Sequence, residues 1–147
     1  MKRYLEGEGS DAEHRSFECS CHSVAEAVAA VDGDPDDFVK NICMVSTEGE
    51  LIVAIVKGED RASTSRVAKA LGIERPRTAT PEEILDMTGF PCGGTPSFGF
   101  EATFLVDPRV PERDEVWTGG GSQTSLVHIR TEEMLRLNDG KVVRVRK

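Results

Sequence analysis

The chain has 147 residues, of which 38% are hydrophobic and 30% charged, and its formal net charge is -8. This length suffices for one hydrophobic core but hardly for two, so we expect a single domain. No apolar run approaches the roughly 20 residues that span a bilayer, and the first ten residues do not resemble a signal peptide, so we expect a soluble, cytoplasmic protein with no membrane partner.

The acidic charge is concentrated near the N-terminus, where residues 1–37 hold ten acids against three bases. The overall charge argues against a nucleic-acid partner, because phosphate binding depends on lysine and arginine. The rest of the chain is nearly neutral and can still present a local basic patch, although scattered solvated charges are the simpler interpretation. Candidates for a patch fall into two groups: Lys57, Arg61, Arg66 and Lys69, and Lys141, Arg144, Arg146 and Lys147.

Helix signals occur in four segments, each with a capping residue before it or a stop signal after it. A serine or threonine hydroxyl at the N-cap accepts a hydrogen bond from the first turn, and glycine allows the left-handed conformation that ends a helix. The predicted helices cover residues 23–31, 63–71 with Ser63 or Thr64 as the cap, 80–89 with a Thr80/Glu83 capping box, and a segment opened by Thr131 and closed around 138–140.

Strand signals, which are short runs of β-branched and aromatic residues, lie between these helices. The predicted strands cover residues 16–21, 38–45, 51–56, 103–106, 115–117, 126–130 and 141–145. This order is not the strict alternation of a doubly wound sheet. We therefore predict a single α/β (α+β) domain over residues 16–147, with a mixed, largely antiparallel, barrel-like sheet surrounded by helices. Residues 1–15 are expected to form a polar, acidic, partly mobile segment.

The least ordinary segment is the loop at residues 90–99, FPCGGTPSFG. The adjacent Gly93 and Gly94 permit close backbone approaches, and the flanking prolines stiffen the loop. Such a loop can direct backbone N–H groups at an oxyanion or a phosphate, although a tight turn with nothing bound is the plainer alternative. No complete phosphate-binding motif is present, which argues against a nucleoside triphosphate site. A second glycine cluster, residues 119–121, can also approach a ligand or form an ordinary turn.

Two titratable side chains stand on predicted strands. Lys40 alternates with Phe38 and Ile42 in the run FVKNICMV, which places its ammonium group on an apolar face unless it reaches water or a ligand. His128, within LVHIR, is a candidate general base, although a structural histidine is the commoner case. Asp107, which precedes Pro108, is expected to cap a turn.

The four cysteines give little support for a metal site. Cys19, Cys21 and His22 lack the spacing of a zinc site, so we expect no metal. Without an export signal, reduced thiols are more plausible than a disulfide framework. Cys92 lies beside the double glycine and is the better candidate for a functional thiol, although no neighbouring base is evident.

Taken in order, these segments resemble the YbaK and prolyl-tRNA-synthetase-associated editing domain family of aminoacyl-tRNA deacylases. The resemblance covers nearly all of the chain after residue 16. It rests on FECSCHSVAEAVAAV, DFVKNICMVSTEGELIVAIVKGEDRASTSRVAKALG, TPEEILDMTGFPCGGTPSFGF and FLVDPRV. Its most specific features are the lysine on its strand and the GGxP loop after a helix that ends in TGF.

The resemblance implies hydrolysis of the ester that joins a wrong amino acid to the terminal adenosine of a tRNA, without metal or cofactor. Lys40 matches the family's essential lysine, and Gly93 and Gly94 match the loop whose backbone positions the carbonyl and the attacking water. The implied substrates are Cys-tRNA(Pro) or Ala-tRNA(Pro), and the implied partners are the misacylated tRNA 3′ end and prolyl-tRNA synthetase. Further contacts to the substrate are expected from Cys92, Thr95, Pro96, Gly120 and His128.

One departure from the family pattern supports an alternative. YbaK-like members tend to carry an aspartate on the strand after the second glycine turn, where this chain has Leu126-Val127-His128. The alternative is a catalytically silent module that binds tRNA or a synthetase. A hydrolase or binder of a small aminoacyl metabolite is a third hypothesis, which only the acidic charge supports.

Overall fold

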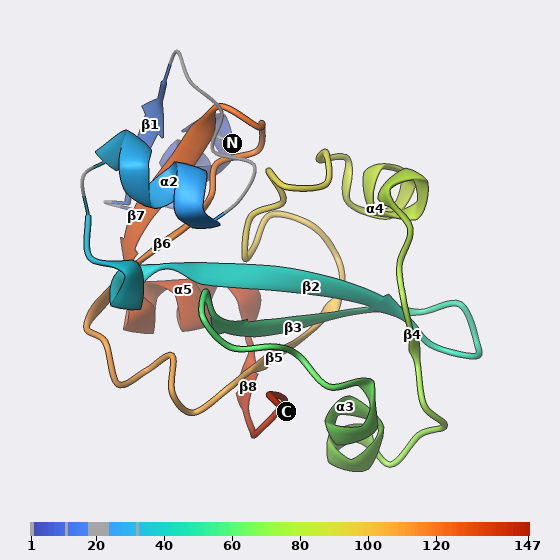
Figure 1. Ribbon diagram of the computed structural model, residues 1–147. Coiled ribbons are helices and arrows are strands. Elements are labelled where there is room, and N and C mark those ends of the chain that lie inside the picture. Colours follow the sequence, from blue (N-terminus) through green and yellow to red (C-terminus); the bar gives the residue numbers. More distant parts are fainter. Residues whose placement is uncertain (1, 11, 18–23, 32) are drawn as a thin grey trace.

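The computed structural model describes residues 2–10, 12–17, 24–31 and 33–147 (Figure 1). The helices are α1 (Lys2–Gly7), α2 (Val24–Val31), α3 (Thr64–Leu71), α4 (Pro81–Thr88) and α5 (Thr131–Asn138), with a 3-10 turn, η1, at Pro35–Asp37. The strands are β1 (Glu13–Ser16), β2 (Val39–Val45), β3 (Leu51–Lys57), β4 (Arg77–Thr78), β5 (Thr103–Val106), β6 (Glu115–Gly119), β7 (Ser125–Arg130) and β8 (Lys141–Val142).

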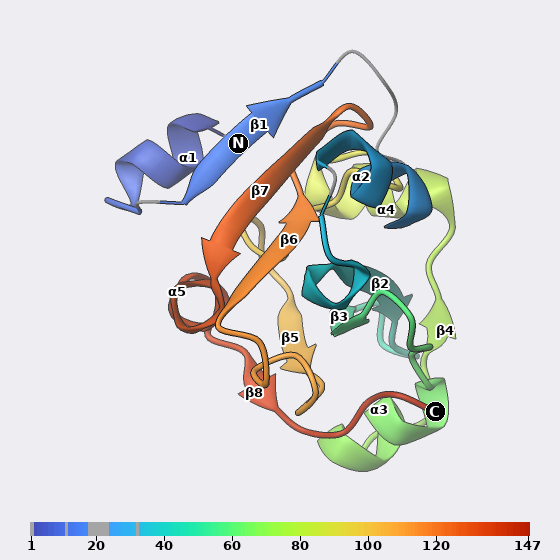
Figure 2. The ribbon, with the colours of Figure 1, turned by 60° about the vertical axis from the view of Figure 1, so that its left-hand side comes forward.

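The strands form two sheets, and Figure 2 shows β1, β7 and β6 of the smaller sheet side by side. The larger sheet has the order β4-β2-β3-β5-β8; β2 is antiparallel to β3 and β4, whereas β5 is parallel to β3 and β8. The smaller sheet, β1-β7-β6, is antiparallel throughout. The mixed α/β class predicted from the sequence is therefore confirmed.

The predicted barrel-like closure is a loose description, because the sheets do not close on themselves. A single parallel bridge, Phe38 to Trp117, joins β2 to β6 among the described residues. Beyond it the loop after α4 lies between the two strands, and side chains, not a backbone ladder, connect them: the Asn41 amide donates to Thr95 O at 2.9 Å and to Thr118 Oγ1 at 3.0 Å. The inserted loop is the physical reason that the sheet stays open.

The capping signals predicted two helices well. Ser63 Oγ accepts from Arg66 N, Thr80 and Glu83 form a reciprocal capping box, and left-handed Gly72 and Gly89 end these helices. The helix predicted to open at Thr131 and to close around residues 138–140 is α5. Thr131 is its first residue, with Arg130 at the N-cap position, and the Thr131 hydroxyl donates to Arg113 O at 2.6 Å.

The N-terminal segment is more structured than the sequence indicated. It contains α1 and β1, and β1 pairs with β7 at residues 13–16, whereas the strand was predicted over 16–21, of which 18–21 lie outside the described residues. Leu5 is buried in the main core, and the Tyr4 ring stacks on Phe98 with 5.8 Å between centroids. The expected mobility of this segment stays a prediction.

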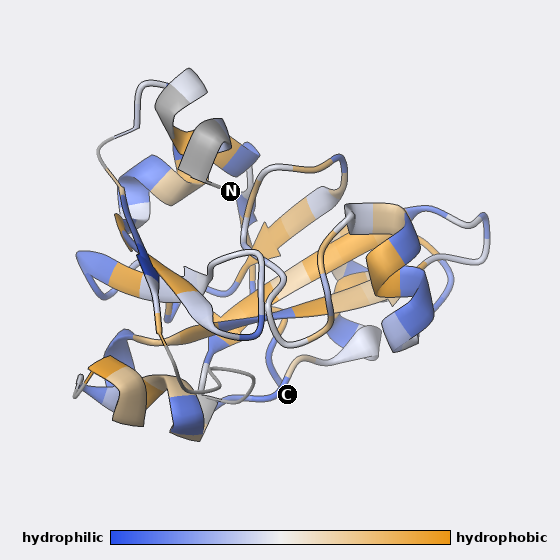
Figure 3. Cartoon of the chain, turned by 90° about the horizontal axis from the view of Figure 1, so that it is seen from above, coloured by the Kyte–Doolittle hydropathy of each residue, from blue (hydrophilic) through white to orange (hydrophobic). Residues whose placement is uncertain are grey.

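The larger sheet separates two apolar clusters. Val39, Cys43 and Val45 face the main core, whereas Met44 packs on the opposite side with Val67 of α3. Figure 3 shows apolar strands inside and polar helix faces outside, as expected for elements that each bury one side. Among the described helices, none combines the length and the apolar character needed to cross a membrane.

Candidate functional site

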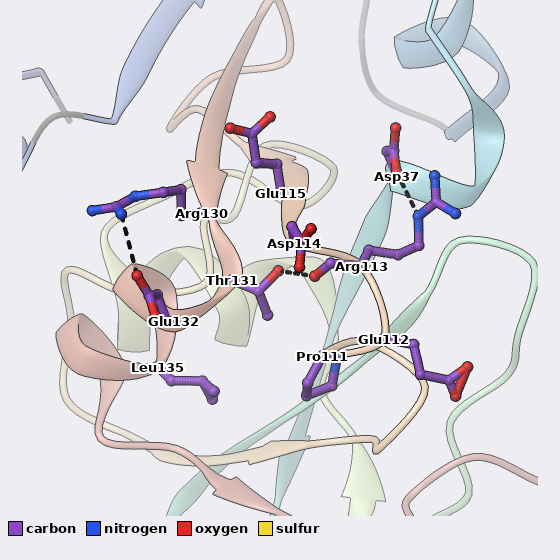
Figure 4. A pocket seen from close by; sticks show the side chains of 10 residues that line it. All are labelled: Asp37, Pro111, Glu112, Arg113, Asp114, Glu115, Arg130, Thr131, Glu132 and Leu135. Carbon is purple, nitrogen blue, oxygen red and sulfur yellow. Dashed lines mark hydrogen bonds and ion pairs between the residues drawn. The ribbon is translucent and has the colours of Figure 1, made fainter.

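One surface cavity, of about 900 Å³, lies between η1, the segment before β6, and α5 (Figure 4). None of the side chains predicted to act on a substrate lines it. Its two arginines are already paired, Arg113 Nε with Asp37 Oδ1 at 2.7 Å and Arg130 Nη1 with Glu132 Oε1 at 3.2 Å. These ion pairs join neighbouring elements, so this cavity is best explained as a structural junction.

The second cavity, about 460 Å³, lies where the two sheets meet. It is bounded by the start of β2, the loop after α4, the end of β6 and single residues of α2 and β7. It brings together several residues that were predicted from the sequence. The lining residues are Ala27, Phe38, Val39, Lys40, Asn41, Ile42, Gly58, Cys92, Gly93, Thr95, Trp117, Thr118, Gly119 and Leu126.

The loop after α4 lines this cavity with Cys92, Gly93 and Thr95. It turns at Pro91, whose carbonyl accepts from Gly94 N at 3.0 Å and from Thr95 Oγ1 at 3.1 Å. Gly93 has a φ of 86°, in the left-handed region that glycine adopts without strain. Within the described part of the chain, the N–H groups of Gly93 and Thr95 have no hydrogen-bond acceptor. Such donors can stabilise a developing oxyanion.

Glycines in this region are required by contact between backbones. A Cβ on Gly94 would lie 2.5 Å from the backbone carbon of Ser122, and one on Gly119 would lie 2.3 Å from Thr95 O. A hydrogen bond from Gly121 N to Gly94 O, 2.8 Å long, joins the same two backbone segments. The two glycine clusters, which are separate in the sequence, therefore pack directly against each other at one wall of the cavity.

A hydrogen-bonded group centred on Asn41 holds this wall to β2. Its amide donates to Thr95 O and Thr118 Oγ1, its Oδ1 accepts from Ser97 Oγ at 2.6 Å, and Ser97 Oγ lies 2.7 Å from Thr118 Oγ1. Both Ser97 and Thr118 are buried. Because Asn41 uses both of its amide hydrogens and its oxygen within the protein, its evident role is to fix the loop in place.

Lys40 projects from β2 into the cavity without an ion-pair partner among the described residues. Burial and the nearby Arg61 guanidinium lower the pKa of Lys40, and Asp60 opposes this only in part. The surroundings therefore disfavour the charged ammonium, which would gain from an anionic or strongly polar ligand group in the cavity. The sequence-based expectation that Lys40 reaches either water or a ligand stays a prediction.

Trp117 forms the aromatic wall of the cavity and is held by stacking. Its ring packs against Phe38 with 6.1 Å between centroids and against His128 with 4.4 Å. His128 Nε2 lies 3.6 Å from Glu115 Oε2. His128 thus supports the Trp117 ring and does not line the cavity, and its predicted contact with substrate stays a prediction.

The remaining predicted residues divide by position. Cys92 lines the cavity as a free thiol, whereas Gly94 and Pro96 are buried just behind the lining. Gly120 is buried too, and a Cβ there would lie 2.5 Å from the Ser125 carbonyl carbon. Cys19, Cys21 and His22 lie outside the described residues, and the described part contains no group of three side chains arranged to hold a metal.

Sequence reasoning missed Asn41, Trp117 and Thr118, whereas Gly119 belongs to the second glycine cluster, which the sequence had indicated as able to approach a ligand. Asn41 carried a usable signal, since it is a polar residue beside Lys40 in an otherwise apolar strand. Trp117 is the single tryptophan of the chain, but its position at the cavity depends on the pairing of Phe38 with β6. Thr118 carried no signal that distinguishes it from an ordinary strand residue.

Comparison with known proteins places this geometry among related domains. Residues 18–137 match the model of the family described as "Aminoacyl-tRNA editing domain". The chain is 27% identical over 150 residues to the Multifunctional Ser/Thr-tRNA deacylase ProXp-y of Escherichia coli (strain K12), covering 97% of this chain and 89% of that protein. It is 31% identical over 99 residues to a Proline--tRNA ligase of Anaeromyxobacter sp. (strain Fw109-5), covering 67% of this chain and 17% of the ligase.

A solved structure shows the same architecture. The crystal structure described as that of a putative trans-editing enzyme for prolyl tRNA synthetase superposes with a TM-score of 0.90 at 27% identity. The match covers 99% of this chain and 94% of that one. This structural similarity therefore extends over nearly the whole chain, including the segments that form the second cavity.

Proposed function

Because this chain belongs to the aminoacyl-tRNA editing domain family, we propose that it is a hydrolase that cleaves the ester between a misattached amino acid and the terminal adenosine of a tRNA. The observation that carries this proposal is the convergence of Lys40 and the Gly93 loop on one cavity. Water adds to the ester carbonyl, the bond to the ribose oxygen breaks, and the proton from water passes to that oxygen. The products are the free amino acid and an intact tRNA.

The loop would act on the carbonyl in this reaction. The unpaired N–H groups of Gly93 and Thr95 are suited to stabilise the oxyanion that forms when water adds. Preorganised donors contribute most when they need not move during the reaction, and the Asn41 hydrogen bonds hold this loop rigidly. Cys92 requires no nucleophilic role in this scheme.

Lys40 would hold the tRNA end. Its ammonium lacks an anionic partner within the described protein, and a phosphate of the terminal nucleotides would supply one. This contact would fix the ester relative to the loop, so its loss should reduce the rate of the bound complex as well as affinity.

The amino acid would occupy the part of the cavity lined by Ala27, Phe38 and Leu126. A volume of about 460 Å³, shared with the tRNA end, favours small side chains, and we propose Cys-tRNA(Pro) or Ala-tRNA(Pro) as substrates. The similarity to a Ser/Thr-tRNA deacylase adds seryl- and threonyl-tRNA as candidates of similar size. The similarity to a proline--tRNA ligase supports prolyl-tRNA synthetase as a partner.

Release of amino acid from Cys-, Ala-, Ser- and Thr-tRNA tests the proposal. We expect the wild-type protein to hydrolyse at least one of them and Lys40→Ala to slow hydrolysis on the order of 100-fold, as for the loss of one preorganised charge-stabilising group. Lys141→Ala is the matched control, because Lys141 is exposed on β8, three strands away from β2. It should behave as wild type.

Each contrary outcome has a definite meaning. Absence of turnover with all four substrates contradicts the enzymatic proposal, and tRNA binding without turnover would identify a silent binding module. Full activity in Lys40→Ala would remove Lys40 from the site.

A further inference from the structure

Two basic segments far apart in the sequence lie side by side in the fold. Residues 61–71 and 140–147 together contain seven basic residues and no acidic one, although the whole chain has 26 acids and 18 bases. Lys147 N donates to Arg61 O at 2.8 Å and Ser63 N to Val145 O at 2.7 Å, and Ala62 and Arg146 form an antiparallel bridge. Figure 2 shows the C-terminal segment running over α3.

Most cations of this joined surface are free of carboxylate partners. Six of the seven form no ion pair with a described carboxylate, the exception being Arg146. One of the six, Lys141, lies on β8 beside β5 and not on the segment that contacts residues 61–63, so we call the other five the basic face. By contrast, Arg77, Arg109, Arg113 and Arg136 are each bound to an acid elsewhere on the protein. The basic face consists of Arg61, Arg66, Lys69, Arg144 and Lys147.

Unpaired cations in an acidic protein are informative. Removing the seven bases of the two segments from the count leaves 11 bases against 26 acids, so the rest of the chain is strongly negative. Mutual repulsion among five neighbouring cations costs stability unless an external anion offsets it. The arrangement is therefore suited to a ligand with several negative charges.

The basic face begins close to the candidate site. Gly58 lines the cavity, and the two residues between it and Arg61 are the acids Glu59 and Asp60, both of which pair with Arg109. Arg61 also lies near enough to Lys40 to affect its charge. The acids of η1 are paired as well, Asp36 with Lys57 and Asp37 with Arg113. Among the described residues, the first unpaired charge along the chain after Gly58 is therefore Arg61, where the basic face begins.

We propose that the basic face binds the phosphate backbone of the RNA helix that leads away from the tRNA 3′ end held in the cavity. This inference rests on the proposed function, because it takes the ligand of the cavity to be the end of a tRNA. Lysine and arginine contacts to phosphate position a nucleic acid without reading its sequence. The basic face would thus supply affinity and orientation, and the cavity would supply selection of the amino acid.

The salt dependence of tRNA binding by the full chain tests this assignment. Lys69→Gln/Lys147→Gln removes one exposed cation from each segment, and neither side chain makes a hydrogen bond or ion pair within the described protein. We expect the double variant to bind uncharged tRNA on the order of tenfold more weakly at 150 mM salt. The slope of log K against log salt should fall by about 1.5, since each phosphate contact contributes 0.7 to 0.9.

Arg130→Gln/Arg136→Gln is the matched control. It removes the same charge from exposed positions at α5, where both arginines already pair with glutamates. The control should bind tRNA with nearly the wild-type slope. Equal losses in both double variants would indicate a general charge effect and overturn the assignment.

The outcomes separate this inference from the proposed function. If wild-type protein deacylates tRNA but Lys69→Gln/Lys147→Gln binds it with wild-type affinity and slope, the basic face is wrong and the enzymatic proposal stands. If no substrate is hydrolysed but tRNA binding depends on the basic face, the enzymatic proposal is contradicted and the assignment of the basic face stands. Binding to vesicles with phosphatidylserine that depends on these lysines, with tRNA binding unaffected, would assign the face to a membrane surface.

Discussion

At the scale of single residues, the glycines of the cavity are needed because they have no side chain. Gly93 has the left-handed backbone, whereas Gly94 and Gly119 are needed because another backbone occupies the space of a side chain. The sequence shows that both clusters are rich in glycine, but it cannot distinguish freedom of φ from close approach. The distinction matters because only the glycines that allow close backbone approach, Gly94 and Gly119, connect the two glycine clusters.

Gly119→Ala tests this coupling. The added methyl group would lie 2.3 Å from Thr95 O and would push the loop away from β6. We expect a loss of about 1–3 kcal/mol in the free energy of unfolding, as for an overpacked interior, together with slower deacylation. Urea unfolding and amino acid release measure the two effects.

Gly7→Ala is the control, because no atom lies within 4 Å of the Cβ position there. Unchanged stability in Gly119→Ala would mean that the loop is free to shift, and the backbone contact would then not position it.

At the scale of elements, the carboxylate of Asp107 fastens the C-terminal segment to the end of β5. Asp107 is fully buried and accepts from Val145 N, Arg146 N and Arg146 Nη1 at 3.1, 3.2 and 2.8 Å. It also accepts from Arg109 N at 3.1 Å, which is the turn cap that the sequence predicted. The contacts to residues 145 and 146 were not predictable, because they join positions 38 and 39 residues apart.

Asp107 should make stability depend on pH. Burial opposes its ionisation, but the backbone donors and the Arg146 guanidinium outweigh burial and lower the pKa below the ordinary 3.8. The contribution is therefore complete above about pH 4 and is lost as the pH falls through the folded-state pKa. Asp107→Asn should lower the free energy of unfolding by about 3 kcal/mol at pH 7, and its deficit relative to wild type should shrink in acid.

Urea unfolding between pH 7 and pH 2.5 measures this deficit. Asp86→Asn, at an exposed position on α4, should show little deficit at any pH. A deficit in Asp107→Asn that stays constant down to pH 2.5 would argue against an ionised carboxylate at this position.

At the scale of the whole molecule, the N-terminal segment closes the core. Leu5 belongs to the same cluster as Val53, Val127 and Met134, which come from both sheets and from α5. Tyr4 stacks on Phe98, the residue after Ser97 of the Asn41 network. The acidic segment, expected from its composition to contribute little, therefore supports the wall of the cavity from behind.

Leu5→Ala should destabilise the whole domain. Leu5 is 3% exposed, and replacing a buried leucine by alanine costs about 3 kcal/mol through lost burial and the cavity that remains. Leu85→Ala is the matched control, because Leu85 is 52% exposed and should cost far less. Cooperative urea unfolding compares them, and equal losses would show that α1 is not part of the core.

The sequence by itself determined what depends on neighbours along the chain. Runs rich in β-branched residues predicted β2 and β3, and local caps predicted α3 and α4. The order of motifs indicated the editing-domain family, and a site at Lys40 and the Gly93 loop stays a prediction. Each of these rests on interactions within a few residues or on a pattern of residue types.

Only the tertiary structure decided what depends on contacts between distant segments. It placed Trp117 and Asn41 at the cavity, moved His128 behind the aromatic wall, left the sheet open around an inserted loop and joined the two basic segments. Except for the stacking of His128 on Trp117, these outcomes follow from contacts between residues 50 or more positions apart, and no local pattern encodes which distant backbone will lie alongside.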